Sequence, residues 1–193
     1  MRIIGGRLRG KTILPPQGYK ARPTTDFAKE GLFNILNNEY EMEGLQVLDL
    51  FGGTGAISYE FASRGASMVY CVEMLPLHAN FIKSQAAKFG MNNLTVVRHN
   101  VFEFLEICRE KFDIVFADPP YALDDLASIP DKVFARNILH PGAYFILEHP
   151  KEFDFSSHAY FLKEKKYGNV HFSFFEAPSG QGESSDVPGE VRP

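Results

Sequence analysis

Short apolar stretches alternate with helix-forming segments along most of this 193-residue chain, and this alternation restricts its fold more than any other feature. Apolar patterning predicts strands at residues 45–50, 68–73, 94–97, 112–117 and 143–148. Helices are predicted at about 26–38, 56–64, 76–90 and 101–108, and at 123–139 with an interruption at Pro130. Repeated strand–helix units require right-handed crossovers between parallel strands. The sequence therefore predicts a doubly wound α/β sheet with helices on both faces.

The two ends of the chain differ from this central part. Residues 159–163 and 170–176 flank the turn-forming residues 167–169, which indicates an antiparallel hairpin added to a mostly parallel sheet. Residues 178–193 are rich in Pro, Gly and Ser and almost lack large apolar side chains, a composition typical of a disordered tail. We therefore expect three parts: an N-terminal arm at 1–25, a domain at 26–177 and a tail at 178–193.

Charge is distributed unevenly along the chain. Residues 1–29 contain seven basic side chains and one acidic one, a formal charge of +6, so the remainder carries −10 of the total of −4. A cationic segment attached to an anionic body is typical of a protein that binds a polyanion such as nucleic acid. Glycines between the cations would let the backbone approach a phosphate chain closely. The candidate phosphate-binding side chains are Arg7, Arg9, Lys11 and Arg22.

Composition argues against several other classes of protein. The chain is 45% hydrophobic and 23% charged, the balance of an ordinary soluble domain. It has neither an apolar run of 18 residues nor the pattern of a secretory signal, so we expect a cytoplasmic protein without a membrane partner. We also expect a monomer. Cys71 and Cys108 lack C-x-x-C spacing and the six histidines lack H-x-x-x-H spacing, so we expect no metal site.

Three loops at predicted strand ends carry polar groups suited to a nucleotide-like cofactor. Gly53 and Gly55 allow the backbone to pass close to a ligand at the start of a helix. Glu73 can accept both hydrogen bonds from a ribose diol, and Asn100 can accept one from an adenine amino group. Ser58 occupies the position at which the G-x-G-x-x-G fingerprint of dinucleotide-binding loops needs its third glycine, which argues against NAD as the cofactor. The loops together predict an adenosine-type cofactor without a long phosphate chain.

The sequence Asp118-Pro119-Pro120-Tyr121 directly follows a predicted buried strand. Its prolines would fix the Asp118 carboxylate, the Pro119 carbonyl and the Tyr121 ring in one geometry. That arrangement suits an exocyclic amino group on a base, because two acceptors on its N–H bonds favour the pyramidal form that can attack a methyl group. Tyr121 would stack on the base, which must be unstacked or single-stranded to reach the pocket.

These motifs resemble those of a known family. The D-x-F-x-G-x-G loop of residues 49–55 and the D-P-P-Y of residues 118–121 resemble class I S-adenosylmethionine-dependent amino-methyltransferases. The opening residues 1–11 and the R-P-T-T-D of residues 22–26 resemble one branch, the bacterial RsmD-type 16S rRNA guanine-N2 methyltransferases. The similarity covers about residues 1–176. D-P-P-Y alone is shared with DNA adenine and several RNA enzymes, whereas the N-terminal combination is much more specific.

The resemblance implies a Rossmann-like class I methyltransferase sheet and a role for each matching residue. Asp49 and the glycines would line the methionine portion of the cofactor, Glu73 its ribose and Asn100 its adenine. Asp118 and Pro119 would hold the guanine amino group, with Tyr121 against the base. The family commonly has an aspartate where this chain has Asn100. The cofactor-binding residues so implied are Asp49, Phe51, Gly53, Gly55, Glu73, Asn100, Val101 and Asp118.

The resemblance further implies direct in-line transfer of the sulfonium methyl group to the N2 of a guanine in the small ribosomal subunit, guanine 966 in the family. Asp118 would orient the amine and take its proton as or after the bond forms, while the basic arm grips rRNA phosphates. Two alternatives remain: an adenine-N6 methyltransferase, disfavoured because the chain lacks a target-recognition domain, and a noncatalytic ribosome-assembly factor. The change Asp118→Ala separates catalysis from binding alone.

Overall fold

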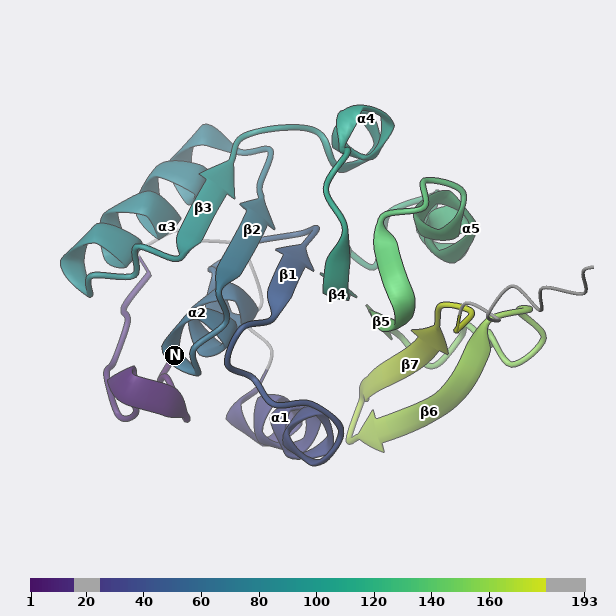
Figure 1. Ribbon diagram of the computed structural model, residues 1–193, viewed down its shortest axis with the longest axis horizontal. Coiled ribbons are helices and arrows are strands. Elements are labelled where there is room, and N and C mark those ends of the chain that lie inside the picture. Colours follow the sequence, from purple (N-terminus) through teal and green to yellow (C-terminus); the bar gives the residue numbers. More distant parts are fainter. Residues whose placement is uncertain (16–24, 180–193) are drawn as a thin grey trace, which may run out of the picture.

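A computed structural model describes residues 1–15 and 25–179 and contains a seven-stranded sheet in the order β3-β2-β1-β4-β5-β7-β6 (Figure 1). Strands β1 to β5 run parallel to one another, and β7 runs antiparallel to both β5 and β6. The doubly wound, mostly parallel sheet with a C-terminal antiparallel hairpin is therefore confirmed. The strands are β1 (Gln46–Asp49), β2 (Met68–Val72), β3 (Leu94–Val97), β4 (Phe112–Ala117), β5 (Leu139–His149), β6 (Phe161–Tyr167) and β7 (Val170–Glu176).

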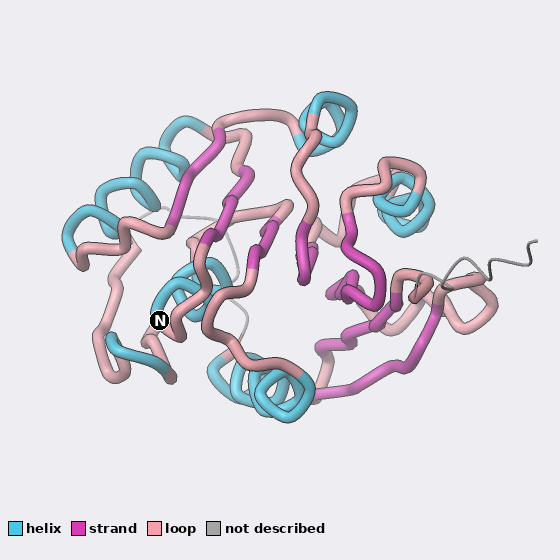
Figure 2. Tube along the Cα trace, viewed as in Figure 1, coloured by secondary structure: helices cyan, strands magenta, loops and turns pink. Residues whose placement is uncertain are grey.

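Helices lie on both sides of the strands (Figure 2). The helices are α1 (Asp26–Glu39), α2 (Ala56–Ser63), α3 (Pro76–Lys88), α4 (Val101–Ile107) and α5 (Ile129–Phe134). Buried side chains of α1, α2 and α3 belong to one hydrophobic cluster, and those of α4 and α5 belong to a second. The central strands contribute to both clusters, Val47 to the first and Leu48 to the second, because successive side chains of a strand point to opposite faces. Burial on both faces explains why these strands are continuously apolar.

Local signals place the helix starts where the sequence predicts them. The Thr25 side chain accepts a hydrogen bond from the Ala28 amide and caps α1. Pro76 occupies the first turn of α3, where its missing N–H has no helical partner to lose. No helix in the described part of the chain is long and apolar enough to cross a membrane.

The helix expected at 123–139 is wrong in extent. The chain forms a short 3₁₀ turn, η2 (Leu126–Ser128), and then the six-residue helix α5. Pro130 lies in the first turn of α5 and does not interrupt a longer helix. A proline lacks the N–H that an interior position must donate, so it marks a helix start. Asn137, at a φ of 51°, follows α5, and the chain enters β5 at Leu139.

The antiparallel hairpin also differs in its boundaries. Its first strand is β6, Phe161–Tyr167, and not the expected 159–163. The turn is shorter than predicted because Tyr167 pairs with Val170, which leaves only Gly168 and Asn169 between the strands. Gly168 has a φ of 63°, a left-handed conformation that glycine adopts without strain. Pairing thus includes Tyr167, which the sequence had placed in the turn.

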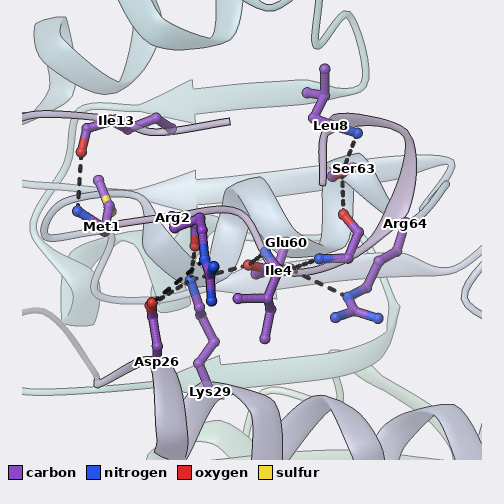
Figure 3. A network of polar contacts seen from close by, with 11 residues as sticks. Met1, Arg2, Ile4, Leu8, Ile13, Asp26, Lys29, Glu60, Ser63 and Arg64 are labelled. Carbon is purple, nitrogen blue, oxygen red and sulfur yellow. Dashed lines mark hydrogen bonds and ion pairs between the residues drawn. The ribbon is translucent and has the colours of Figure 1, made fainter. Parts of the chain in front are cut away.

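Residues 1–15 fold back on themselves and pack against the domain. Arg2 and Thr12 form an antiparallel bridge, and the N-terminal amine donates to the Ile13 carbonyl at 3.1 Å (Figure 3). Ile3, Leu8 and Ile13 are buried in the cluster that also covers α1 and α2. We call residues 1–13 the N-terminal hairpin. The expected division into arm, domain and tail stays a prediction, and residues 16–24 and 180–193 lie outside the described part.

Glu60 attaches the N-terminal hairpin to α2 (Figure 3). Its fully buried carboxylate accepts hydrogen bonds from the Ile4 amide at 2.7 Å and the Gly5 amide at 3.2 Å. Lys29 Nζ lies 3.1 Å from one oxygen and Arg64 Nε lies 3.4 Å from the other. The carboxylate therefore bridges the N-terminal hairpin, α1 and α2. A buried charge is tolerated when it is paired and hydrogen-bonded in this way.

Candidate active site

The sheet topology brings the predicted site residues to one edge. Asp49 ends β1, Glu73 directly follows β2, and Asp118 directly follows β4. Asn100 follows β3 after a short loop. Because β1 to β4 are parallel, their carboxyl ends meet at the same edge of the sheet. Ligands of open α/β sheets bind outside this edge, at the point where strand order reverses.

Asp49 is a buried carboxylate with one oxygen left over. Its side chain is only 1% exposed, and Ser58 on α2 donates to Oδ2 at 2.6 Å. Among the described residues, Oδ1 has no hydrogen-bond partner. Burial raises the pKa of Asp49 to about 6, an effect that the Ser58 hydroxyl and neighbouring amides partly oppose. A buried acceptor without a protein partner is suited to a ligand that brings an N–H group or a positive charge.

The glycine turn after β1 leaves no room for side chains. A Cβ on Gly52 would lie 2.5 Å from Cys71 Sγ, and one on Gly55 would lie 2.6 Å from the Tyr59 ring. Gly53 and Gly55 have φ values of 53° and 83°, which disfavour other residues. Gly55 is the N-cap of α2. The bare backbone therefore turns directly into a helix beside Asp49, the geometry that the sequence predicted.

Glu73 holds this turn against the end of β2. Its Oε2 accepts from the Gly53 amide at 2.8 Å, and its Oε1 accepts from the Leu75 amide at 2.7 Å. His78 Nδ1 lies 3.8 Å from Oε2. The Glu73 side chain is thus fixed in place at the carboxyl edge of the parallel strands. A carboxylate has further lone pairs, so these contacts leave acceptor capacity for hydroxyl groups.

Asn100 caps α4 with the atom that was expected to meet the adenine. Its Oδ1 accepts from the Phe102 amide at 2.9 Å and from the Glu103 amide at 3.3 Å. Its Nδ2 lies 3.9 Å from the sulfur of Met74. The carbonyl oxygen therefore already serves as a helix cap, a use that the sequence pattern did not reveal. Contact with an adenine amino group through this oxygen stays a prediction.

The remaining expected cofactor residues are apolar and lie next to these loops. Val101 is buried at the start of α4, and the half-buried Phe51 packs against the same cluster. Both contribute apolar surface between the acidic strand ends. This position agrees with a wall of a ligand site, although the ligand contact itself is a prediction.

The D-P-P-Y segment directly follows β4, and its first residue, Asp118, is a second carboxyl group with a raised pKa. Asp118 is half-buried, and burial raises its pKa well above the usual value, with Glu148 and Asp49 adding repulsion. Pro119 is buried, and the Leu123 amide donates to the Pro120 carbonyl to close the turn. Tyr121 is 45% exposed. An accessible aromatic side chain thus follows Asp118 three residues later in the chain.

Sequence reasoning missed Glu148. This residue is 4% exposed and lies near the end of β5, the strand next to β4. The signal was an acid immediately after the apolar run Ala143–Leu147, which the sequence analysis treated as the end of a strand. The structure instead continues β5 to His149, and Glu148 is enclosed.

Among the expected RNA-binding residues, Arg7 has a structural contact of its own. Its guanidinium donates to the Gly90 carbonyl at 2.7 Å and to the Phe89 carbonyl at 3.4 Å. Arg9 and Lys11 are exposed on the N-terminal hairpin. Arg22 lies outside the described residues. The hairpin thus presents accessible cations on a fixed framework.

One side-chain group in the described residues has metal-ligand geometry. His149, Glu164 and His171 place ligand atoms within 4.8 Å of one another on β5, β6 and β7. Hydrogen bonds already link His171 to Glu164 and His149 to Ser173, each at 2.8 Å. These bonds account for the arrangement, and the expected absence of a metal stays a prediction.

Comparisons with known proteins agree along nearly the whole chain. Residues 1–176 match the model of a family described as conserved hypothetical protein 95. A relative in Haemophilus influenzae, named ribosomal RNA small subunit methyltransferase D, is 30% identical over 182 residues, which cover 91% of this chain and 93% of its own. A relative of the same name in Buchnera aphidicola is 28% identical over 179 residues, 91% of each chain. The solved structure of Escherichia coli YhhF is similar with a TM-score of 0.82 and 30% identity, covering 93% of this chain and 99% of that one.

Proposed function

Because this chain belongs to the conserved hypothetical protein 95 family, the family of RsmD-type ribosomal RNA methyltransferases, we propose that it methylates the exocyclic N2 amine of a guanine in 16S rRNA. The cofactor is S-adenosylmethionine. The target position that we propose is guanine 966. The observation that carries the proposal is the convergence of Asp49 and Asp118 at one sheet edge, each with a pKa raised by burial.

The residues at this edge fit the cofactor. When bound, S-adenosylmethionine supplies a methyl group carried on a positively charged sulfur. The partnerless Oδ1 of Asp49 is suited to accept from its ammonium group, and Glu73 is suited to accept from its ribose hydroxyls. The glycine turn leads directly into the start of α2, where backbone amides are suited to a carboxylate of the ligand. A positive charge also offsets the repulsion among these carboxylates.

Asp118 and Pro119 orient the attacking amine. Two acceptors on the N–H bonds of guanine N2 direct its lone pair toward the methyl group and restrict its motion. Asp118 takes one amine proton as or after the new N–C bond forms, so no strong base is required. Tyr121 provides an exposed ring on which the target base stacks. Positioning supplies most of the acceleration.

The N-terminal hairpin provides the proposed rRNA contact. Arg9 and Lys11 are exposed on it, and Arg7 fixes it to the end of α3. Phosphate contacts of this kind set the orientation of the protein on its substrate without reading sequence.

Methyl transfer to matched polyanions tests this function. Radiolabelled S-adenosylmethionine is incubated with unmodified small ribosomal subunits, protein-free 16S rRNA and adenine-rich DNA in parallel. Label in either ribosomal substrate is expected, because the cationic hairpin and the amine-holding site act together on RNA. Label in DNA alone identifies an adenine-N6 enzyme. Cofactor binding with no transfer to any substrate identifies a noncatalytic factor and overturns the proposal.

A further inference from the structure

Glu148 lies beside the proposed reaction centre, yet the proposed mechanism gives it no task. Strands β4 and β5 pair in parallel, with Ala117 opposite Leu147. The next residue on each strand is Asp118 and Glu148, so their positions are lateral neighbours at the carboxyl edge. Glu148 is 4% exposed, more deeply enclosed than the half-buried Asp118. An acid held at this depth requires favourable interactions with hydrogen-bond donors.

Both charged groups that shift the pKa of Asp118 are acidic. Burial raises this pKa most, and Glu148 and Asp49 raise it further. This part of the site therefore presents hydrogen-bond acceptors on neighbouring strands. It is suited to a ligand edge that carries several N–H donors side by side. A carboxylate has about four acceptor positions, so Glu148 can keep its protein contacts and accept from a ligand as well.

The Watson–Crick edges of the two purines differ at this point. Guanine carries an N1–H donor directly beside its N2 amine. Adenine carries an N1 lone pair beside its N6 amine. A carboxylate next to the group that holds the amine attracts the first arrangement and repels the second, since two acceptors facing each other leave a buried polar pair unsatisfied.

We propose that Glu148 accepts the N1–H of the target guanine while Asp118 and Pro119 hold its N2 amine, and that this contact selects guanine over adenine. The inference rests on the proposed function. Glu148 is therefore a specificity-determining residue, and Asp118 remains the residue that orients the reacting nitrogen.

Replacing the target guanine with 2-aminopurine isolates the N1–H contact, because 2-aminopurine keeps the C2 amine but has an acceptor at N1. Single-turnover methyl transfer is measured on both RNAs with the wild-type protein and with Glu148→Gln. The wild type is expected to prefer guanine by more than about tenfold. Glu148→Gln is expected to lose activity on guanine and to bring the ratio of the two rates near one, because an amide can donate to the N1 of 2-aminopurine. The missing O6 of 2-aminopurine affects both proteins alike.

Two controls separate this inference from a structural role and from the proposed function. Glu152→Gln, an exposed acid just after β5, is expected to keep the wild-type ratio. Equal losses on both RNAs in Glu148→Gln indicate a structural role and overturn the inference. A wild-type protein that methylates both RNAs equally also overturns it, even if Glu148→Gln does not fold. A wild-type protein that methylates no guanine disproves the proposed function itself.

Discussion

The buried carboxylate of Asp49, suited to a ligand, lowers the free energy of unfolding of the ligand-free protein. Its pKa is about 6, compared with an ordinary value of 3.8, because the carboxylate is buried. A carboxyl group whose pKa is higher in the folded than in the unfolded state binds its proton more tightly when folded. Ionisation therefore lowers the free energy of unfolding as pH rises through about 6, and the penalty is absent below 3.8. A cationic ligand offsets this penalty.

The change Asp49→Asn removes the buried charge and keeps an acceptor for Ser58. The ligand-free variant is expected to exceed the wild type in free energy of unfolding by about 2 kcal/mol at pH 8. The difference should disappear near pH 3.5, where the wild-type residue is protonated in both states. Urea denaturation at both pH values measures it, with the exposed Asp124→Asn as the control. A variant less stable than the wild type at pH 8 would show that the ionised carboxylate is stabilising.

The change Asp118→Asn tests the proposed role of Asp118 in orienting the amine. The variant is expected to bind S-adenosylmethionine within about tenfold of the wild type but to lose methyl transfer by about 100-fold or more, because an amide neither accepts a proton nor holds the amine as strongly. Calorimetry gives the affinity and single-turnover transfer gives the rate. Asp124→Asn should match the wild type in both. Full activity of Asp118→Asn would remove Asp118 from the mechanism.

Helix α2 connects the glycine turn after β1 to the N-terminal hairpin. At its start, Gly55 ends the cofactor turn and Ser58 donates to Asp49. Near its end, Glu60 and Ser63 bind the backbone of the N-terminal hairpin. All eight of its residues are buried. The proposed RNA-binding hairpin and the cofactor turn are therefore mounted on one short rigid helix.

The change Glu60→Gln tests the connection between α2 and the N-terminal hairpin. The change leaves Lys29 and Arg64 without their buried carboxylate, so the free energy of unfolding is expected to fall by about 2–4 kcal/mol. The Ile4 and Gly5 amides should also exchange hydrogen faster, since one of their acceptors is weakened. Glu30→Gln, on the exposed face of α1, is the matched control. Unchanged stability would show that Glu60 does not hold the hairpin.

For the whole molecule, charge separation is the dominant feature. The first 29 residues carry +6 and the rest carries −10. The N-terminal hairpin nevertheless shares its buried side chains with the domain core. The backbone that carries Arg7, Arg9 and Lys11 is thus held at a fixed position relative to the carboxylate edge, which itself is suited to a cationic cofactor and a donor-rich base.

Removing two exposed cations from the N-terminal hairpin tests its proposed role in rRNA binding. Arg9→Ala combined with Lys11→Ala is expected to weaken rRNA binding and to reduce by nearly two the slope of log affinity against log salt concentration. Lys165→Ala combined with Lys166→Ala, two exposed cations on β6, should leave the slope unchanged. Salt titrations of binding to 16S rRNA measure both. An equal decrease in slope for the two pairs would contradict a specific role for the N-terminal hairpin.

The sequence predicted most of the fold because its signals are local. The residues of β3 and β4 were predicted without error. For β4 the reason is that a strand buried on both faces needs continuous apolar side chains. Pro130 misled the prediction because a proline marks both an interruption and a first turn, and only the neighbouring packing distinguishes them. Glu60 was not identified because Ile4, Gly5 and Lys29, which contact its carboxylate, are distant in sequence. Glu148 was not identified because its place beside Asp118 depends on the pairing of β4 with β5. Their importance depends on the register of elements that no local pattern encodes.

The identity of the methylated nucleoside directly tests whether the protein methylates the N2 amine of a guanine in 16S rRNA. Unmodified small ribosomal subunits are incubated with the protein and S-adenosylmethionine, and their rRNA is digested to nucleosides for mass spectrometry. N2-methylguanosine is the predicted product, because we propose that Asp118, Pro119 and Glu148 accept from the N–H edge of guanine. N6-methyladenosine in its place would contradict both the proposed substrate and the role of Glu148.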